Sequence, residues 1–200
     1  MDARTQKSEL TRAAIVGAAM DLASAEGVEA ISLQAVADRI GLSKSGVFSR
    51  VGSREALQKA VIEEFGRRFL ADVFVPAMQL PKGLPRLDEI MQRWITRVRD
   101  VDARNGCIFS AAAFELDDRE GPLRDVLHGE VTRWRAALRR TVLQAVEAGH
   151  LKADTDPGQL AGEACALVLG LVHDARFLRD AHAADRTRST WRRLLQTYKK

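Results

Sequence analysis

Helix caps and helix stops alternate between residues 27 and 54 almost as closely as a helical chain allows. Serine side chains accept hydrogen bonds from first-turn amides, and glycine adopts the left-handed conformation that ends a helix. The residues that mark these ends are Gly27, Ser32, Gly41, Ser43, Gly52 and Ser53. Their spacing predicts two helices of about two turns each, over residues 32–40 and 43–51, joined by a sharp turn at Gly41. Two short helices related in this way form a helix-turn-helix.

Helical periodicity continues on both sides of this segment. Apolar residues recur at helical spacing, and no strand-like alternation bounded by turns is present. The further expected helices cover about residues 8–26, 53 to just before Pro76, 86–101, 107–116, 122–148, 157–181 and 184–198, with a loop over Gln79–Pro85. The chain is therefore predicted to be all-α, with about nine helices.

Two domains are expected. The 200 residues are 46% hydrophobic and 29% charged, a balance that excludes disorder and allows a sizeable core. Residues 8–68 are expected to form a small helix-turn-helix domain, with the motif itself at about residues 32–51. Residues 69–200 are expected to form a larger helical domain.

Basic residues gather on the second short helix and its flanks. The chain has 31 Lys and Arg against 27 Asp and Glu, and the net charge of +4 names no partner. From Arg39 to Arg54, however, there are basic residues and no acid. The second helix opens with Ser43-Lys44-Ser45-Gly46, whose small side chains allow its first-turn amides to approach phosphates. This pattern favours docking on DNA, and the alternative is a solvated helical hairpin with incidental basic residues.

Other functional classes find little support. Cys107 and Cys165 are too few for a disulfide framework or a zinc site, and the histidines show no metal-binding spacing. Gly41–Gly46 lacks the spacing and the preceding strand of a nucleophile elbow, and no P-loop or dinucleotide fingerprint occurs. We therefore expect no enzyme, no metal and no cofactor. A helical adaptor that binds only protein is the main alternative, and a small enzyme is a weaker one.

Signals for export or membrane insertion are not recognised. The first residues lack the apolar run of a signal peptide, and no segment reaches the roughly 18 apolar residues of a membrane span. The chain is expected to act in the cytoplasm without a membrane partner.

A longer pattern runs through the front of the chain. It includes Thr11-Arg12, Ala18-Ala19, Gly41-Leu42-Ser43-Lys44-Ser45-Gly46-Val47-Phe48 and Ser53-Arg54-Glu55-Ala56-Leu57. Over about residues 8–65 it resembles, without insertion, the N-terminal domain of the TetR family of transcriptional regulators. Two positions depart from the family pattern: Phe48 stands in place of a phosphate-contacting Tyr, and Val51 in place of a core Phe.

The resemblance implies a ligand-responsive transcriptional regulator that binds a palindromic double-stranded DNA operator as a homodimer. Repression is the commoner role in the family, and release by a small-molecule effector of unknown identity is the implied mechanism. The recognition helix is expected to enter the major groove with its N-terminus. The residues expected to contact DNA are Gln34, Ser43, Lys44, Ser45, Gly46, Phe48, Ser49, Arg50 and Arg54.

The rear domain is expected to bind the effector and to form the dimer. The candidate effector contacts are Met91, Trp94, Cys107, Phe114, Trp134, His173 and Phe177, and for each the alternative is an ordinary core or surface role. Cys107 is either a reactive sensor thiol or an inert buried one. The candidate dimer contacts are Leu160, Ala164, Leu167, Leu171, Trp191 and Leu195, for which burial within one subunit is the alternative. The basic segment Arg186–Lys200 is interpreted as a solvated outer helix face, with an extra nucleic-acid or membrane-surface contact as the alternative.

Overall fold

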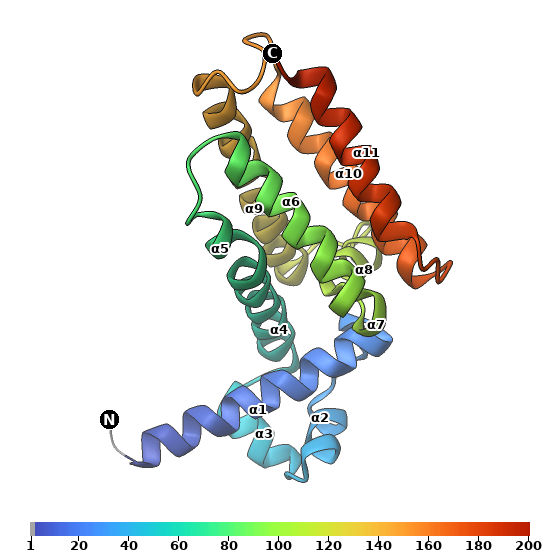
Figure 1. Ribbon diagram of the computed structural model, residues 1–200. Coiled ribbons are helices and arrows are strands. Elements are labelled where there is room, and N and C mark those ends of the chain that lie inside the picture. Colours follow the sequence, from blue (N-terminus) through green and yellow to red (C-terminus); the bar gives the residue numbers. More distant parts are fainter. Residues whose placement is uncertain (1–2) are drawn as a thin grey trace. The chain divides into compact units, whose positions relative to one another are not determined.

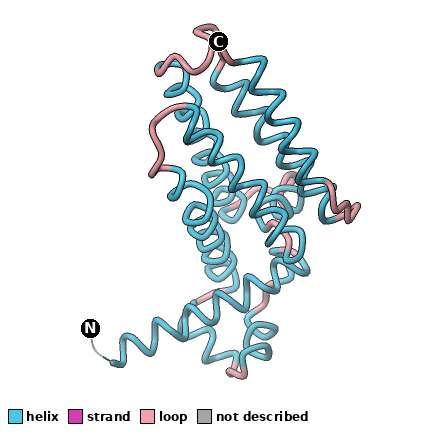
Figure 2. Tube along the Cα trace, in the orientation of Figure 1, coloured by secondary structure: helices cyan, strands magenta, loops and turns pink. Residues whose placement is uncertain are grey.

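The computed structural model describes the backbone of residues 3–200 and the side chains of residues 6 and 8–200. Within these residues all regular structure is helical, apart from one isolated bridge between Leu151 and Lys199 (Figure 2). The prediction of an all-α chain is confirmed. The part of the chain that the structure describes has nine α-helices of eight residues or more.

The helices follow in the order labelled in Figure 1. The front elements are α1 (Ala3–Glu26), the 3-10 helix η1 (Val28–Ala30), α2 (Leu33–Ile40), α3 (Lys44–Val51) and α4 (Arg54–Phe69). Next come the π-helical turn η2 (Leu70–Phe74), α5 (Val75–Ala77), α6 (Leu84–Arg97), the π-helical turn η3 (Val98–Asp102) and α7 (Ala103–Asn105). The last are α8 (Ile108–Glu115), α9 (Pro122–Glu147), α10 (Pro157–Arg176) and α11 (Ala183–Tyr198).

The chain forms two compact units. The first contains the residues up to Arg67 together with Ile108–Glu130, and the second contains Arg68–Cys107 and Val131–Lys200. The chain therefore leaves the first unit within the last turn of α4 and returns to it for α8 and the start of α9. The sequence division at residue 68 does not include this return.

In the first unit the short helices end where their caps predict. The side-chain oxygens of Ser32, Ser43 and Ser53 each accept a hydrogen bond of 3.0 Å from the amide three residues later. Gly41 has the left-handed conformation (φ 66°, ψ 33°), which turns the chain from α2 into α3. The apolar faces of these helices meet in a core that includes Ile15, Ala19, Ile31, Val36, Ala37, Val47, Leu57 and Val61.

In the second unit α6, α9, α10 and α11 enclose one continuous core. Its members include Leu87, Met91, Ile95, Val142, Leu160, Ala164, Leu171, Trp191 and Leu195. The indole of Trp191 is fully buried, and its Nε1–H donates to Asp88 Oδ1 at 2.8 Å. α10 and α11 lie side by side along this core (Figure 1).

Two helix ends differ from their predicted positions. The helix expected to stop before Pro76 continues through η2 into α5, because a proline in the first turn of a helix needs no amide partner. The helix expected to reach residue 181 ends at Arg176, and the chain then turns through Arg179, which has a φ of 55°. None of the described helices is both long enough and apolar enough to span a bilayer.

Candidate functional site

α3 presents a polar and basic outer face. Val47 is fully buried against the core of the first unit, which fixes the opposite side of the helix outward. The outward residues are exposed: Ser43, Lys44, Ser45, Phe48, Ser49 and Arg50. Phe48 is 57% exposed, so its ring lies at the surface of α3. The helix predicted to read DNA is therefore accessible along its length.

The N-terminus of α3 is built for close approach. Ser43 caps the helix by accepting from the Gly46 amide, and the hydroxyl of Ser45 lies 3.1 Å from that of Ser43. A Cβ at Gly46 would lie 3.1 Å from the capping oxygen, so glycine keeps the cap unhindered. First-turn amides have no acceptor within their own helix and attract anions. The absence of acids from Arg39 to Arg54 leaves this positive end uncompensated within the motif.

Three predicted DNA contacts with long polar side chains, Gln34, Arg50 and Arg54, already make hydrogen bonds within the first unit. Arg50 Nη1 donates to the Gly46 carbonyl at 2.9 Å, and Gln34 Nε2 donates to Asp38 Oδ1 at 2.7 Å. Both are exposed local contacts that a phosphate can replace. Arg54 differs, as described next.

The side chain of Arg54 is directed at main-chain oxygens. Its Nε donates to the Ile31 carbonyl at 2.8 Å, and its Nη2 donates to the Glu29 carbonyl and lies 3.3 Å from the Glu29 carboxylate. The side chain is nevertheless 49% exposed. Sequence reasoning assigned Arg54 to phosphate and missed that it also holds the segment that leads into α2.

A second set of contacts on the same segment comes from α8. The carboxylate of Glu115 accepts from the amides of Val28 and Glu29 at 2.9 and 2.8 Å. Gly27, at φ 94°, permits this approach, because a Cβ there would lie 3.0 Å from both carboxylate oxygens. Gln58 Nε2 donates to the Val28 carbonyl at 2.9 Å from the opposite side of η1. The sequence did not predict that Glu115 contacts η1. Gly27 was the only nearby residue that pointed to a close approach there.

Two of the predicted effector residues meet in the second unit. The rings of Trp94 and Trp134 lie 5.1 Å apart at 87°, and Phe69 packs edge-on to both, at 5.6 and 4.8 Å. Trp134 is buried, and its Nε1–H has no hydrogen-bond partner among the described residues. A buried donor without a partner lowers the stability of the folded protein. We name Phe69, Trp94 and Trp134 the aromatic cluster.

A buried ion pair borders the aromatic cluster. The guanidinium of Arg97 lies 5.8 Å from the centre of the Phe69 ring, pairs with Asp72, and places its Nε 3.6 Å from Asp102 Oδ1. Asp102 is 1% exposed. Burial raises the pKa of its carboxyl to about 6, and Arg97 opposes the rise.

The remaining effector candidates are dispersed. Met91 is fully buried in the core of the second unit, whereas Phe114 is 67% exposed in the first. Cys107 is half-buried. His173 and Phe177 are both exposed, with ring centres 5.3 Å apart at the end of α10. The candidates thus do not line one common pocket.

Most of the predicted dimer contacts lie inside their own chain. Leu160, Ala164, Leu171, Trp191 and Leu195 are at most 4% exposed, because they pack against α6 in the core of the second unit. Leu160, Ala164, Trp191 and Leu195 are thereby withdrawn from surfaces that a second copy can reach in this conformation, whereas Leu171 also lines the groove between α10 and α11. Only Leu167 is half-buried.

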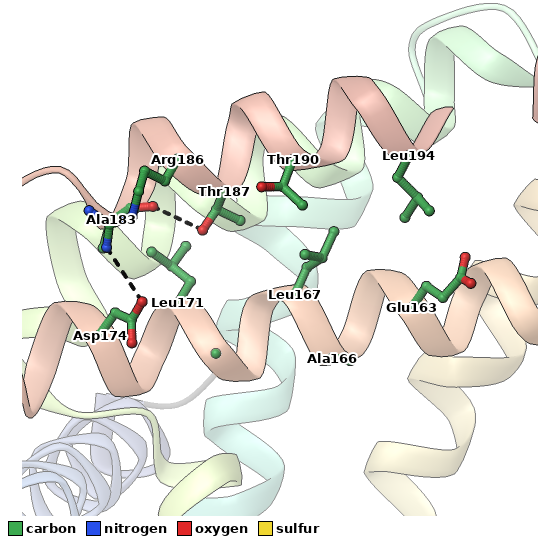
Figure 3. Close-up of a pocket in the computed structure, with 11 residues that line it drawn as sticks. Glu163, Ala166, Leu167, Leu171, Asp174, Ala183, Arg186, Thr187, Thr190 and Leu194 are labelled. Atoms are coloured by element: carbon green, nitrogen blue, oxygen red, sulfur yellow. Dashed lines mark hydrogen bonds and ion pairs between the residues drawn. The ribbon is translucent and has the colours of Figure 1, made fainter. Parts of the chain in front are cut away.

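A groove of about 560 Å³ runs between the outer faces of α10 and α11 (Figure 3). Small and apolar residues, Ala166, Leu167, Gly170 and Leu194, alternate along it with polar ones. Asp174 of α10 pairs with Arg186 of α11 at 3.5 Å near one end. Among the residues that the structure describes, no group of His, Cys, Asp and Glu is suited to holding a metal ion.

An exposed recognition helix on a small helical unit, with a larger helical unit behind it in the chain, defines a helix-turn-helix transcriptional regulator. Comparison with family models agrees. Residues 15–61 match the model described as bacterial regulatory proteins, tetR family, and residues 83–191 match the model described as tetracyclin repressor-like, C-terminal domain. The second match covers more than half of the chain, and the chain belongs to the TetR family, with a DNA-binding N-terminal domain.

Solved structures share the fold. A TetR-family regulator from Cytophaga hutchinsonii is 20% identical with a TM-score of 0.82, and the match covers 96% of each chain. A TetR regulator from Chloroflexus aurantiacus is 20% identical with a TM-score of 0.84, covering 97% of this chain and 98% of that one. AibR, solved in complex with isovaleryl coenzyme A and operator DNA, is 22% identical with a TM-score of 0.71, covering 90% and 96%. A search of curated proteins gave no match.

Proposed function

We propose that this chain is a ligand-responsive repressor that acts in the cytoplasm and binds a palindromic operator as a homodimer. The observation that carries the proposal is the exposed outer face of α3, which has basic and small polar residues and no acid. A small molecule that binds the second unit lowers operator affinity by shifting the population of dimers away from the DNA-binding conformation.

The N-terminus of α3 enters the major groove. Lys44 and Ser45 reach base edges or phosphate from the first turn, and the cap at Ser43 keeps the helix end open to an anion. Phe48, Ser49 and Arg50 follow on the exposed side and face the DNA backbone. Gln34 adds a backbone contact, and Arg54 contributes both its exposed charge and its hold on residues 29–31.

The homodimer is supported by the groove between α10 and α11. One short recognition helix reads too few base pairs for operator specificity, so two are needed. Leu167 and Leu194 point into the space between the two helices (Figure 3). Ala166 and Gly170 also line the groove, and such small residues allow a helix of a second copy to approach closely. This surface keeps Leu167 and Leu171 of the contacts expected from the sequence and leaves out Leu160, Ala164, Trp191 and Leu195.

The effector contacts the aromatic cluster. The unpaired Nε1–H of Trp134 offers a hydrogen bond to a ligand oxygen or nitrogen, and the rings offer apolar surface. AibR, whose structure holds isovaleryl coenzyme A and operator DNA, gives an example of this fold with both kinds of ligand. Coupling between the two sites of about 1–3 kcal/mol is the usual scale.

A gel-shift titration with the DNA that flanks the protein's own gene tests the proposal. We expect salt-sensitive binding that Lys44→Ala weakens about tenfold, because a charged contact at the DNA surface is lost. Lys82→Ala, in the exposed loop before α6, is the matched control and should bind as the wild type does. Absence of binding at low salt refutes the proposal and favours a protein-binding adaptor.

A further inference from the structure

A cleft lined by arginines lies at the carboxyl end of α10. Its volume is about 820 Å³, which falls in the range of small-molecule sites. Arg104 of α7 and Arg176 and Arg179 at the end of α10 supply its charge, and Phe177 supplies an aromatic wall. None of the residues that line the cleft is acidic. Its composition is that of a site for an anion.

The carboxylates nearest along the chain to Arg176 and Arg179 pair with other groups. Asp174 lies 3.1 Å from the imidazole of His173 and 3.5 Å from Arg186, and Asp180 also pairs with Arg186. Arg176 is fixed in place, since its Nη1 donates to the main-chain oxygen of Arg104 at 3.2 Å. This hydrogen bond holds Arg176 in position. The residues that line the cleft carry no negative charge, and Asp100, outside the cleft, interacts electrostatically with Arg104.

The backbone at Arg179 is strained. Its φ of 55° is the one positive value at a non-glycine residue in the described chain, and the other positive values all belong to glycines. A glycine adopts this conformation without penalty, whereas an arginine loses stability in it. Strain at a residue whose side chain lines a cleft indicates that the side chain has a use there. The guanidinium of Arg179 makes no hydrogen bond or ion pair with the residues that the structure describes.

An apolar surface adjoins the charges. Phe177 is 77% exposed, and its ring lies 5.3 Å from that of His173 at 38°. An exposed aromatic ring beside cationic groups suits a ligand that joins a flat apolar group to an oxyanion. Arginine forks bind phosphate oxygens in pairs, which favours phosphate over a single hydrogen-bond acceptor.

We propose that this cleft binds a small phosphate ester of an apolar or aromatic molecule. The site shares no residue with the aromatic cluster, and binding there requires neither DNA nor the effector of the proposed function. The inference therefore goes beyond the proposed function and fails or holds separately from it.

Isothermal titration of the full chain tests the proposal with 1-naphthyl phosphate, 1-naphthol and inorganic phosphate as probes. We expect one naphthyl phosphate per chain, with naphthol and inorganic phosphate each about tenfold weaker, because each lacks one half of the recognised group. Equal affinity for naphthol and naphthyl phosphate, or no binding of the ester at millimolar concentration, overturns the proposal.

The variant Arg179→Gly distinguishes a loss of ligand binding from a loss of folding. The variant is expected to bind naphthyl phosphate about tenfold more weakly and to melt about 3 °C higher, because the strain is relieved as the charge is lost. Arg192→Ala removes an exposed arginine of α11 outside the cleft and should change neither value. An equal loss of affinity in both variants shows diffuse attraction to a basic surface and overturns the site.

Competition with operator DNA is the last test of the cleft. If an operator fragment displaces the probe from the wild type, the cleft belongs to the DNA interface and the small-molecule assignment is overturned. A preparation that binds the operator but not the probe refutes only this site and leaves the proposed function intact.

Discussion

The Glu115 carboxylate is expected to hold the entrance to the helix-turn-helix. It accepts two main-chain amides, at Val28 and Glu29, which η1 itself cannot satisfy. Hydrogen bonds to a charged acceptor contribute about 1.5–3 kcal/mol each, and the lower end applies because these are only partly buried. Glu115→Ala should therefore cost the first unit about 3 kcal/mol.

Two readouts measure this loss. Thermal or urea unfolding gives the change in stability, and amide hydrogen exchange gives its location. The amides of Val28 and Glu29 are expected to exchange about a hundredfold faster in the variant, because a free-energy loss of about 3 kcal/mol corresponds to a ratio of that size. Glu115→Gln keeps one acceptor oxygen, so its stability and exchange rates should lie about midway between those of the wild type and Glu115→Ala. Glu120→Ala, an exposed acid in the loop after α8, is the matched control.

A double-mutant cycle with Gly27 sharpens the test. Gly27→Ala alone forces a Cβ to within 3.0 Å of both carboxylate oxygens and also strains a φ of 94°. In the Glu115→Ala background the crowding is gone, so Gly27→Ala should lower the free energy of unfolding less than it does in the wild type. Strictly additive losses, or unchanged exchange at the two amides in Glu115→Ala, would refute the reasoning.

Three further outcomes are expected. Arg54→Ala should weaken operator binding evenly across sequences and lower the salt slope by no more than about one, and a loss confined to one base pair in a gel-shift series contradicts this. Asp102→Asn should stabilise the protein at pH 7.5 by up to about 3 kcal/mol and by little at pH 4. The pKa of Asp102 in the folded protein, about 6, lies above the ordinary aspartate value of 3.8, so the wild type loses stability as the pH rises between them. An identical pH dependence of the melting temperature in both proteins would contradict this role of Asp102. His150→Ala should lower the urea midpoint by the equivalent of about 1 kcal/mol, since the Leu84 amide loses its 3.2 Å acceptor, and an unchanged midpoint argues against that role.

Local features of the fold were predictable from the sequence. The caps at Ser32, Ser43 and Ser53 act on amides three residues away, and the turn at Gly41 depends on its own backbone. Such signals lie within one helical turn of the residues that produce them, and they placed the helix-turn-helix correctly. The outward face of α3 was implied by the family resemblance, because apolar content alone does not distinguish the buried Val47 from the exposed Phe48.

Contacts between distant residues were not predictable in the same way. Glu115 reaches Val28 across 87 residues, and no periodicity records such a pairing. Trp191 was assigned to a dimer surface, because an apolar stripe shows only that a helix is covered on one side. Whether α6 or a second copy covers it depends on how the helices of the second unit pack.

The return of residues 108–130 to the first unit limits how this regulator can be recombined. A chimaera that grafts only the stretch up to Arg67 onto a foreign sensor inherits a reading head without the α8 carboxylate that anchors it. Grafts that also carry Ile108–Glu130 keep the anchor but must accept the parent's connection into α9. Exchange of sensors between such proteins is therefore constrained by an inserted segment rather than by a single junction.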